Sequence, residues 1–316
     1  MNASPRRTRR HTTVFALITA SALALTACGG GSDDAGPGGE GRGAVPTEDV
    51  VSGVKKDAAA ARLLPAEVRE RGSLRLATNV GGSPPGNSYL EDGKTITGLD
   101  ADIATATAKV LGLRLRTEAA GFEAILPALS SGKYDVGTGN FGVTEARRKT
   151  IDFVTYINDG QGFAVREDSD LKKVTDLKQL CGLDIGTSAG TTFEATLEEN
   201  KHICAESGKK PYAVKTYAEQ GALWPSLQQG RTDVLMSTIN GLRYGVAQQE
   251  GLKFLGEFHR LDVGFAFKKG TPLAPAFQAA VNRLIEDGTY ARILKKWGTE
   301  KSALPASKIS PPEIKD

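Results

Sequence analysis

Two stretches of the chain share one pattern of apolar and polar positions. Residues 126–136 and 224–234 both read apolar-Pro-small-Leu-polar-polar-Gly-basic-any-Asp-Val, and the second copy begins 98 residues after the first. Each copy predicts a helix that ends at its Gly, because Gly readily adopts the left-handed conformation that closes helices. A short strand should follow each helix, over residues 135–138 and 233–237.

A second pair of similar stretches lies upstream of these helices. Residues 74–79 and 183–188 alternate in character and run into Gly-rich turns, which is typical of strands. Two β–α–β units of this kind predict an α/β protein with two lobes, each containing a mostly parallel sheet.

Apolar stripes predict three further helices that should pack into the cores. The first begins at Asp100 or Asp102, either of which can cap it, and ends at Gly112. The other two fall near the C-terminus, over residues 277–285 and 290–297.

The N-terminus has the layout of an export signal. Residues 1–27 contain four Arg and no acid, and their apolar run, 14–27, is too short to span about 30 Å of hydrocarbon as a helix. Residues 25–29 resemble the lipobox of bacterial lipoproteins, which implies that Cys28 is lipidated and becomes the mature N-terminus. An ordinary cleaved signal is the alternative, and Sec and twin-arginine export both stay open. Residues 28–71 are expected to form a flexible tether and lead-in.

The charge balance changes once the signal is set aside. The full chain of 316 residues, enough for about two domains, has 40 Lys and Arg against 37 Asp and Glu. Removing residues 1–27 leaves 36 bases against 37 acids. Nucleic-acid binding, which needs a basic face on the folded part, loses its support.

Six motifs in order resemble the bacterial extracellular solute-binding proteins of the polar amino-acid uptake family. They lie within residues 72–300, at 98–103, 129–135, 144–147, 151–153, 190–192 and 288–290. The resemblance implies the two-lobed, type II periplasmic-binding-protein-like fold, in which two crossing hinge strands join the sheets. It places lobe 1 at residues 72–160 and 264–300, lobe 2 at 161–263 and a tail at 301–316, with crossings near 159–162 and 261–264.

The ends of the repeated strands are candidate ligand-binding positions. Ligands of open parallel sheets bind outside the carboxyl ends of the strands, so Asn140 and Thr238 should face each other across a cleft. Thr144 is a plausible helix N-cap, and Arg147 lies in the first turn that follows. In the family the matching Arg binds the ligand's α-carboxylate, a role that suits a guanidinium. The alternative is a solvated helix Arg, as we interpret Arg148.

Other residues complete the expected ligand-binding set. The 190–192 loop follows the first strand of lobe 2, and in the family it completes the carboxylate site; a plain helix cap is the alternative. Aromatic residues are missing around Pro84 and Pro85, so the aromatic wall is expected at Phe122, with Phe141 or Tyr89 as alternatives. The full set is Asn79, Phe122, Asn140, Gly142, Thr144, Arg147, Thr191, Thr192 and Thr238.

Thr238 departs from the family pattern, where an Asp usually pairs with the ligand's ammonium. A neutral Thr cannot neutralise a buried cation. Three alternatives follow: polar groups including Asn140 and Thr238 solvate the ammonium, an acid comes from elsewhere, or the ligand is not a standard α-amino acid.

Cofactor and metal sites are not expected. Residues 137–142 read G-x-G-x-x-G after a strand, but extended character resumes at Ile151, too soon for the crossover helix of a dinucleotide-binding fold. Cys181 and Cys204 suggest a disulfide in an oxidising compartment. A metal site with His202 is the rival, but it offers too few ligands for structural zinc.

The sequence therefore predicts a receptor rather than an enzyme. We expect a monomer, lipid-anchored on the outer face of the cytoplasmic membrane, that closes on a small amino-acid-like solute and delivers it to the permease subunits of an ABC importer. An enzyme like the related dehydratases is the alternative, but none of the cleft residues identified from sequence is a general acid or base, and His202 and His259 lie outside the motifs. A sensory subunit is a third alternative.

Overall fold

The computed structural model describes residues 45–82 and 84–315. The predicted signal segment, the lipidation site Cys28 and the tether up to residue 44 lie outside these described residues. From Val45 onward the expected lead-in packs on the body, because Val45, Val50, Val51 and Val54 contact the largest apolar core.

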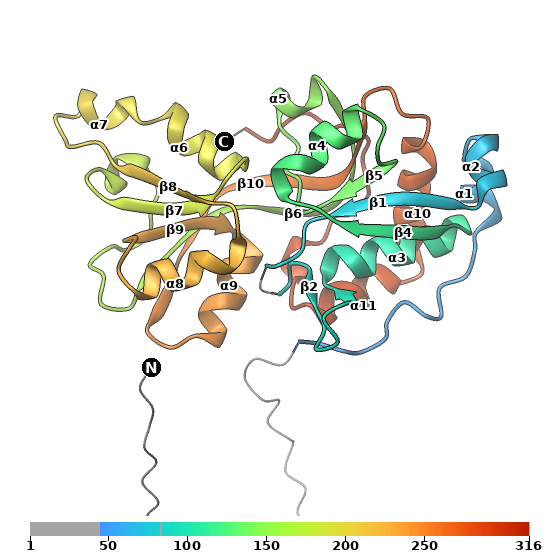
Figure 1. Cartoon of the computed structure of the whole chain (residues 1–316), viewed down its shortest axis with the longest axis horizontal. Coiled ribbons are helices and arrows are strands. Elements are labelled where there is room, and N and C mark those ends of the chain that lie inside the picture. Colours follow the sequence, from blue (N-terminus) through green and yellow to red (C-terminus); the bar gives the residue numbers. More distant parts are fainter. Residues whose placement is uncertain (1–44, 83, 316) are drawn as a thin grey trace, which may run out of the picture. The chain divides into compact units, whose positions relative to one another are not determined.

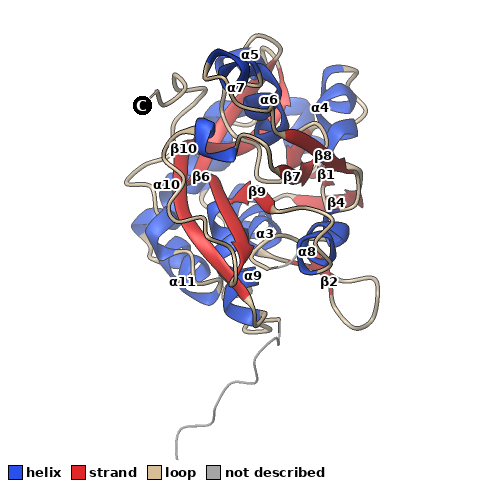
Figure 2. Cartoon of the chain, turned by 90° about the vertical axis from the view of Figure 1, so that its left-hand side faces the viewer, coloured by secondary structure: helices blue, strands red, loops and turns tan. Residues whose placement is uncertain are grey.

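One mixed sheet of eight strands runs through the body (Figure 1). Its central strands, β6 and β10, are antiparallel partners along almost their whole length, with three register shifts. Figure 2, which is turned by 90° about the vertical axis, also shows them side by side. In sheet order the strands are β4 (Arg114–Ala119), β1 (Ser73–Thr78), β5 (Val136–Thr138), β10 (Leu252–Lys268), β6 (Ile151–Arg166), β9 (Val234–Thr238), β7 (Asp184–Ser188) and β8 (Ala213–Tyr217). A separate hairpin pairs β2 (Ser88–Tyr89) with β3 (Ile96–Thr97).

The two expected sheets are joined into one. Strands β4, β1 and β5 are parallel to each other, as are β9, β7 and β8. β10 pairs with β5 and β6 pairs with β9, so the β6–β10 pair continues both ladders. We call the part built on β1, β4 and β5 lobe 1, and the part built on β7, β8 and β9 lobe 2. The predicted crossings, 159–162 and 261–264, lie within β6 and β10.

Helices cover both faces of each lobe. In lobe 1, α3 (Leu99–Leu111), α10 (Ala274–Glu286) and α11 (Thr289–Lys296) lie on one side, and α4 (Phe122–Ser130) and α5 (Glu145–Arg148) on the other (Figure 1). In lobe 2, α6 (Thr192–Glu199) and α7 (His202–Glu206) lie opposite α8 (Leu223–Gln228) and α9 (Ile239–Gln248). Each side has its own apolar core. The remaining helices are α1 (Ala58–Arg62), α2 (Ala66–Arg71) and the 3₁₀ turns Leu177–Leu180, Gln220–Ala222 and Glu300–Ser302.

The sequence repeat corresponds to a structural repeat. α4 and α8 each end just before a Gly with positive φ, at Gly132 and Gly230, and a short strand follows in both lobes. The Asp of each copy has the same role. The backbone N–H of Arg75 donates to the Asp135 carboxylate at 2.8 Å, and that of Asp184 donates to the Asp233 carboxylate at 2.9 Å. Each Asp therefore fixes the start of its own strand against the neighbouring one.

The expected cap of α3 is wrong. The helix begins after Gly98, and no side chain at that position caps it. The Oδ1 atom of Asn87, in the preceding loop, instead accepts the N–H of Ala101 at 3.1 Å. Asp102 accepts from Lys296 and Trp297 on the other side of the helix. Asp100 is thereby left for another role.

The C-terminal tail packs against the body. Residues 307–310 run along the first part of β6, where Ile309 forms a bridge with Val154. Near the end of the tail, the Glu313 carboxylate accepts the backbone N–H of Glu145 at the start of α5, at 2.7 Å. Earlier in the tail, Ser302 hydrogen-bonds the buried side chain of Asn240 at the start of α9.

Cys181 and Cys204 form a disulfide with their Cα atoms 5.6 Å apart. It ties the 3₁₀ turn Leu177–Leu180 to α7 at the edge of the lobe 2 core.

Candidate functional site

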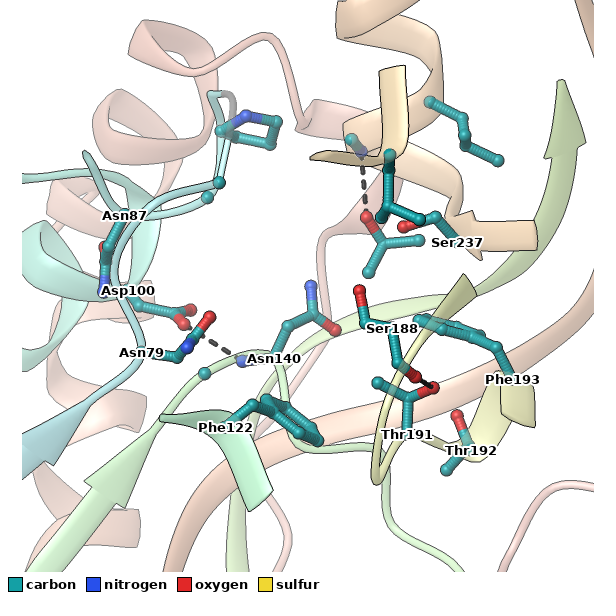
Figure 3. A pocket seen from close by; sticks show the side chains of 18 of the residues that line it. Asn79, Asn87, Asp100, Phe122, Asn140, Ser188, Thr191, Thr192, Phe193 and Ser237 are labelled. Carbon is teal, nitrogen blue, oxygen red and sulfur yellow. Dashed lines mark hydrogen bonds between the residues drawn. The ribbon is translucent and has the colours of Figure 1, made fainter. Parts of the chain in front are cut away.

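A cleft between the lobes collects the carboxyl ends of the repeated strands (Figure 3). Asn140, just after β5, and Thr238, at the end of β9, both line it, as the repeat predicted. Its lining residues from the lobe 1 side are Asn79, Gly82, Pro85, Gly86, Asn87, Leu99, Asp100, Phe122, Gly139, Asn140 and Arg147. From lobe 2 they are Ser188, Thr191, Thr192, Phe193, Leu223, Trp224, Leu235, Ser237, Thr238, Gly241 and Leu242.

Arg147 is held at the cleft by a very short helix. The Thr144 side chain accepts the backbone N–H of Arg147, which caps the four-residue helix α5 and fixes where the guanidinium starts. The guanidinium donates to the Gly142 carbonyl at 3.2 Å and, across the cleft, to the Gly190 carbonyl at 3.3 Å. It also lies 5.8 Å from the centre of the Phe122 ring, a favourable cation–π position.

No carboxylate pairs with Arg147 among the described residues. Its two acceptors are neutral carbonyls, and burial lowers the pKa of its guanidinium to about 10. Desolvation disfavours a charge that nothing nearby neutralises. A ligand carboxylate in the cleft would supply the missing charge, in bonds to a planar guanidinium that can be bidentate.

Asn140 has an unusual backbone and two buried anchors. Its φ is +55°, in the left-handed region that a non-Gly residue rarely occupies. The backbone N–H donates to Asp100 at 3.0 Å, and the side-chain amide donates to Asp159 at 2.9 Å. Both carboxylates are buried, Asp159 completely. The loop after β5 is therefore fixed at the cleft by carboxylates beneath it.

Asp159 also reaches lobe 2. Asp159 lies in β6. Its Oδ2 atom accepts from the side chain of Asn140, and its Oδ1 atom accepts the backbone N–H of Asn240, in the first turn of α9, at 3.2 Å. One carboxylate thus joins the ligand-facing loop of lobe 1 to the helix that follows Thr238. Burial raises the pKa of Asp159 to about 6, although the Asn140, Asn240 and Gly160 donors oppose that shift.

The predicted threonines are mostly helix caps. Thr191 accepts the Glu194 N–H and caps α6, and Thr238 accepts the Gly241 N–H and caps α9. The capping alternative for the 190–192 loop therefore describes Thr191 correctly, while Thr191 and Thr192 still line the cleft. The Thr238 hydroxyl keeps its proton for donation, but it brings no negative charge.

Two predicted positions do not line this cleft. Gly142 contributes the carbonyl that holds Arg147, and Thr144 contributes its cap. Thr144 lines a second hollow instead, on the other side of the Arg147–Gly190 contact. Of the aromatic alternatives, Phe141 is fully buried beneath Phe122, and Tyr89 is exposed and outside the lining.

Other lining residues were missed from the sequence. Phe193 and Trp224 are the second residues of α6 and α8 in lobe 2, and apolar side chains at such helix positions usually belong to the core. Trp224 packs against α9 at Gly245, where an added Cβ would lie 2.0 Å from the indole. Ser188 and Ser237 sit at strand ends, the same signal that identified Asn140 and Thr238. Asp100 was the most consequential omission, because it lines the cleft and its carboxylate accepts the backbone N–H of Asn140 rather than capping α3 (Figure 3).

The order of motifs along the chain is matched by a known protein family. The model of the bacterial extracellular solute-binding proteins, family 3, covers residues 74–300. The chain belongs to this family. The family membership predicted from the sequence is confirmed. Proteins of this family are extracytoplasmic.

Curated relatives of this family 3 protein bind amino acids. The arginine-binding protein ArgT of Corynebacterium glutamicum is 29% identical over 251 residues, which cover 78% of this chain and 81% of ArgT. The L-cystine-binding protein TcyJ of Escherichia coli K12 is also 29% identical, over 73% of this chain and 84% of TcyJ.

Solved structures agree with the two-lobed, type II fold. An ancestral arginine-binding protein bound to arginine has a TM-score of 0.65 and 31% identity, and the match covers 72% of this chain and 98% of that one. The ancestral amino acid-binding protein AncCDT-1, a precursor of cyclohexadienyl dehydratase, has a TM-score of 0.64 and 26% identity, with 73% and 97% covered. The predicted fold class is confirmed.

Two kinds of feature are absent from the described residues of this family 3 protein. Within 45–82 and 84–315, no helix is both long and apolar enough to span a bilayer. The same residues contain no group of three or more His, Cys, Asp and Glu side chains placed to hold a metal ion.

The raised pKa of Asp159 predicts a pH-dependent stability. The folded protein holds this proton more tightly than the unfolded chain, in which the pKa of Asp159 is near 3.8. The contribution of this proton to the free energy of unfolding is therefore largest below about pH 4 and is lost as the pH rises through about 6. Between pH 4 and 7 we expect the wild type to lose roughly 2 kcal/mol of unfolding free energy through Asp159, a loss that Asp159→Asn does not show. Urea unfolding of both proteins at these pH values measures it. Equal pH dependence in the two proteins would contradict the assignment.

Proposed function

We propose that this protein is a lipid-anchored receptor that binds a small amino-acid-like solute between its lobes and delivers it to an ABC importer. The observation that carries the proposal is the cleft itself, which brings an Arg147 guanidinium without a carboxylate partner to residues of both lobes. The amino-acid binding of the relatives supports the choice of solute class. The proposal assigns residues 72–160 and 264–300 to lobe 1 and 161–263 to lobe 2.

Binding would couple to closure because the cleft has walls on both lobes. A solute that contacts Arg147 in lobe 1 and the Thr191–Thr192 segment in lobe 2 stabilises the closed arrangement by its differential contacts. The β6–β10 pair would act as the hinge, since it is the continuous connection between the two ladders. The cleft residues proposed to contact the solute are Asn79, Phe122, Asn140, Arg147, Thr191, Thr192 and Thr238, with Gly142 and Thr144 positioning Arg147.

A ligand screen tests the receptor. In a thermal-shift panel of amino acids, betaines, ectoines and small peptides, a ligand at 100 times its Kd should raise Tm by roughly 5 °C. The ligand should be recovered unchanged when the same sample is analysed by mass spectrometry. A panel without any stabilising compound would contradict the proposal.

Turnover would favour the dehydratase alternative. The similarity to AncCDT-1 keeps this alternative in view, and Asp100 gives the cleft an acid that the sequence analysis did not place there. Burial raises the pKa of Asp100, which is the direction that a general acid requires. Release of water from a panel compound would therefore assign an enzyme rather than a receptor.

Arg147→Ala should abolish solute binding without unfolding the protein. Removing the guanidinium takes away the proposed carboxylate partner, and we expect Kd to rise at least about 100-fold in isothermal titration calorimetry. Arg148→Ala is the matched control, because Arg148 lies next in the same helix but pairs with Glu145 and the Ser310 carbonyl. A change of less than about fivefold for Arg147→Ala, or an equal change for both variants, would rule out the carboxylate role.

Cys28 should determine where the protein resides. If Cys28 carries the lipid, Cys28→Ser should move the protein from the membrane fraction to the soluble fraction, because the acyl chains supply the membrane affinity. Immunoblots of the two fractions measure this shift. Cys181→Ser/Cys204→Ser is the control and should stay in the membrane fraction. Retention of the Cys28 variant would favour the ordinary signal without an anchor.

A further inference from the structure

The cleft contains one basic and one acidic side chain. Among the described residues that line it, only Arg147 and Asp100 have ionisable side chains. Both come from lobe 1, from α5 and the first turn of α3. The lobe 2 wall is neutral throughout, with Ser188, Thr191, Thr192, Ser237 and Thr238 as its polar residues.

The Asp100 carboxylate has no cation to balance it. Only 6% of the residue is exposed, and its hydrogen-bond donors are neutral: the Tyr156 hydroxyl at 2.6 Å, the Asn140 N–H at 3.0 Å and the Gly139 N–H. No Lys, Arg or His pairs with it among the described residues. Burial raises its pKa despite these donors, because they satisfy lone pairs without cancelling the charge. A carboxylate offers about four acceptor positions, so it retains capacity for another donor.

Arg147 is basic, and it too lacks an oppositely charged partner among the described residues. Its guanidinium donates to two backbone carbonyls and has no carboxylate partner in the described chain. The two opposite charges do not pair with each other. They remain available to the same cleft, as a zwitterion would require.

We propose that Asp100 receives the ammonium group of the ligand, and that the cleft is matched to an amino acid whose side chain has no net charge. This inference rests on the proposed function, and it assigns the role that the family usually gives to an Asp at position 238. Thr238 is neutral and its oxygen caps α9, whereas Asp100 brings a carboxyl group to the lining of the cleft (Figure 3).

The side-chain pocket supports a neutral ligand. A bound arginine would bring a second cation, and the cleft has no second carboxylate to neutralise it. A bound glutamate would bring a second anion with no second base. The rest of the wall is apolar or neutral, with Phe193, Trp224 and Ser237 in lobe 2 and Asn79 in lobe 1. The ligand named for the relative ArgT is therefore not the one that this lining favours.

Calorimetry with a charge-graded panel tests the ligand class. The probes are glutamine, serine, leucine and methionine as neutral side chains, arginine and lysine as cations, and glutamate and aspartate as anions. The tightest neutral probe should bind at least about tenfold more tightly than every charged one. Tighter binding of arginine or glutamate overturns the inference and leaves the receptor proposal standing. Binding of none of the eight overturns the inference, and the wider panel of betaines, ectoines and small peptides then decides the receptor proposal.

Removal of the ammonium tests the role of Asp100. In the wild type, the des-amino analogue of the tightest probe should bind at least about 100-fold more weakly than the amino acid. In Asp100→Asn this difference should shrink to less than about tenfold. Asp102→Asn is the matched control, because Asp102 lies on the same helix and pairs with Lys296 and Trp297. An undiminished difference in Asp100→Asn overturns the assignment.

A structure of the wild-type protein with the tightest probe provides a test that needs no variant. The ammonium nitrogen should lie within hydrogen-bond distance of an Asp100 carboxylate oxygen, at about 2.7–3.2 Å. An ammonium that bonds only Thr238, Asn140 or backbone carbonyls overturns the role of Asp100, even if Asp100→Asn fails to fold.

Discussion

The antiparallel pairing of β6 with β10 is the constraint on which the rest of the structure depends. These two strands are shared by both lobes, so they determine where the ends of β5 and β9 meet. Asp159 lies within this pair and is fully buried, with Asn140 bonded to one oxygen and the Asn240 N–H to the other. The loops that line the cleft are thus anchored on the shared strand β6 itself. Any relative motion of the lobes must be accommodated around this carboxylate.

The acidic and the basic side chain of the cleft both lack an oppositely charged partner among the described residues. Elsewhere in the body, Asp135 forms ion pairs with Arg71 and Arg75. In the cleft, Arg147 and Asp100 have only neutral partners. Desolvated charges without counter-ions are costly, and structures keep them where a ligand supplies the missing charge. A ligand that supplied both opposite charges would recover this cost as binding free energy.

Local patterns in the sequence predicted much of the architecture. The repeated Gly and Asp positions located both helix–strand units because each acts within a few residues of itself or on the adjacent strand. The same repeat placed Asn140 and Thr238 at the cleft. Asp100 was misread because an Asp at a helix start usually caps it, and the actual cap, Asn87, comes from a loop whose path the sequence does not reveal. Trp224 and Phe193 could not be separated from core residues without knowing which face of each helix meets lobe 1.

The packed tail has an evolutionary consequence. The family match ends at residue 300, yet Ser302 bonds Asn240 beside Thr238 in lobe 2, and Glu313 bonds the backbone of α5, which carries Arg147 in lobe 1. If the lobes close on a solute as proposed, substitutions in this tail would shift the population of closed molecules, and apparent affinity follows the fraction that is competent to bind. Two members with identical cleft residues could therefore diverge in affinity through a segment that does not line the cleft.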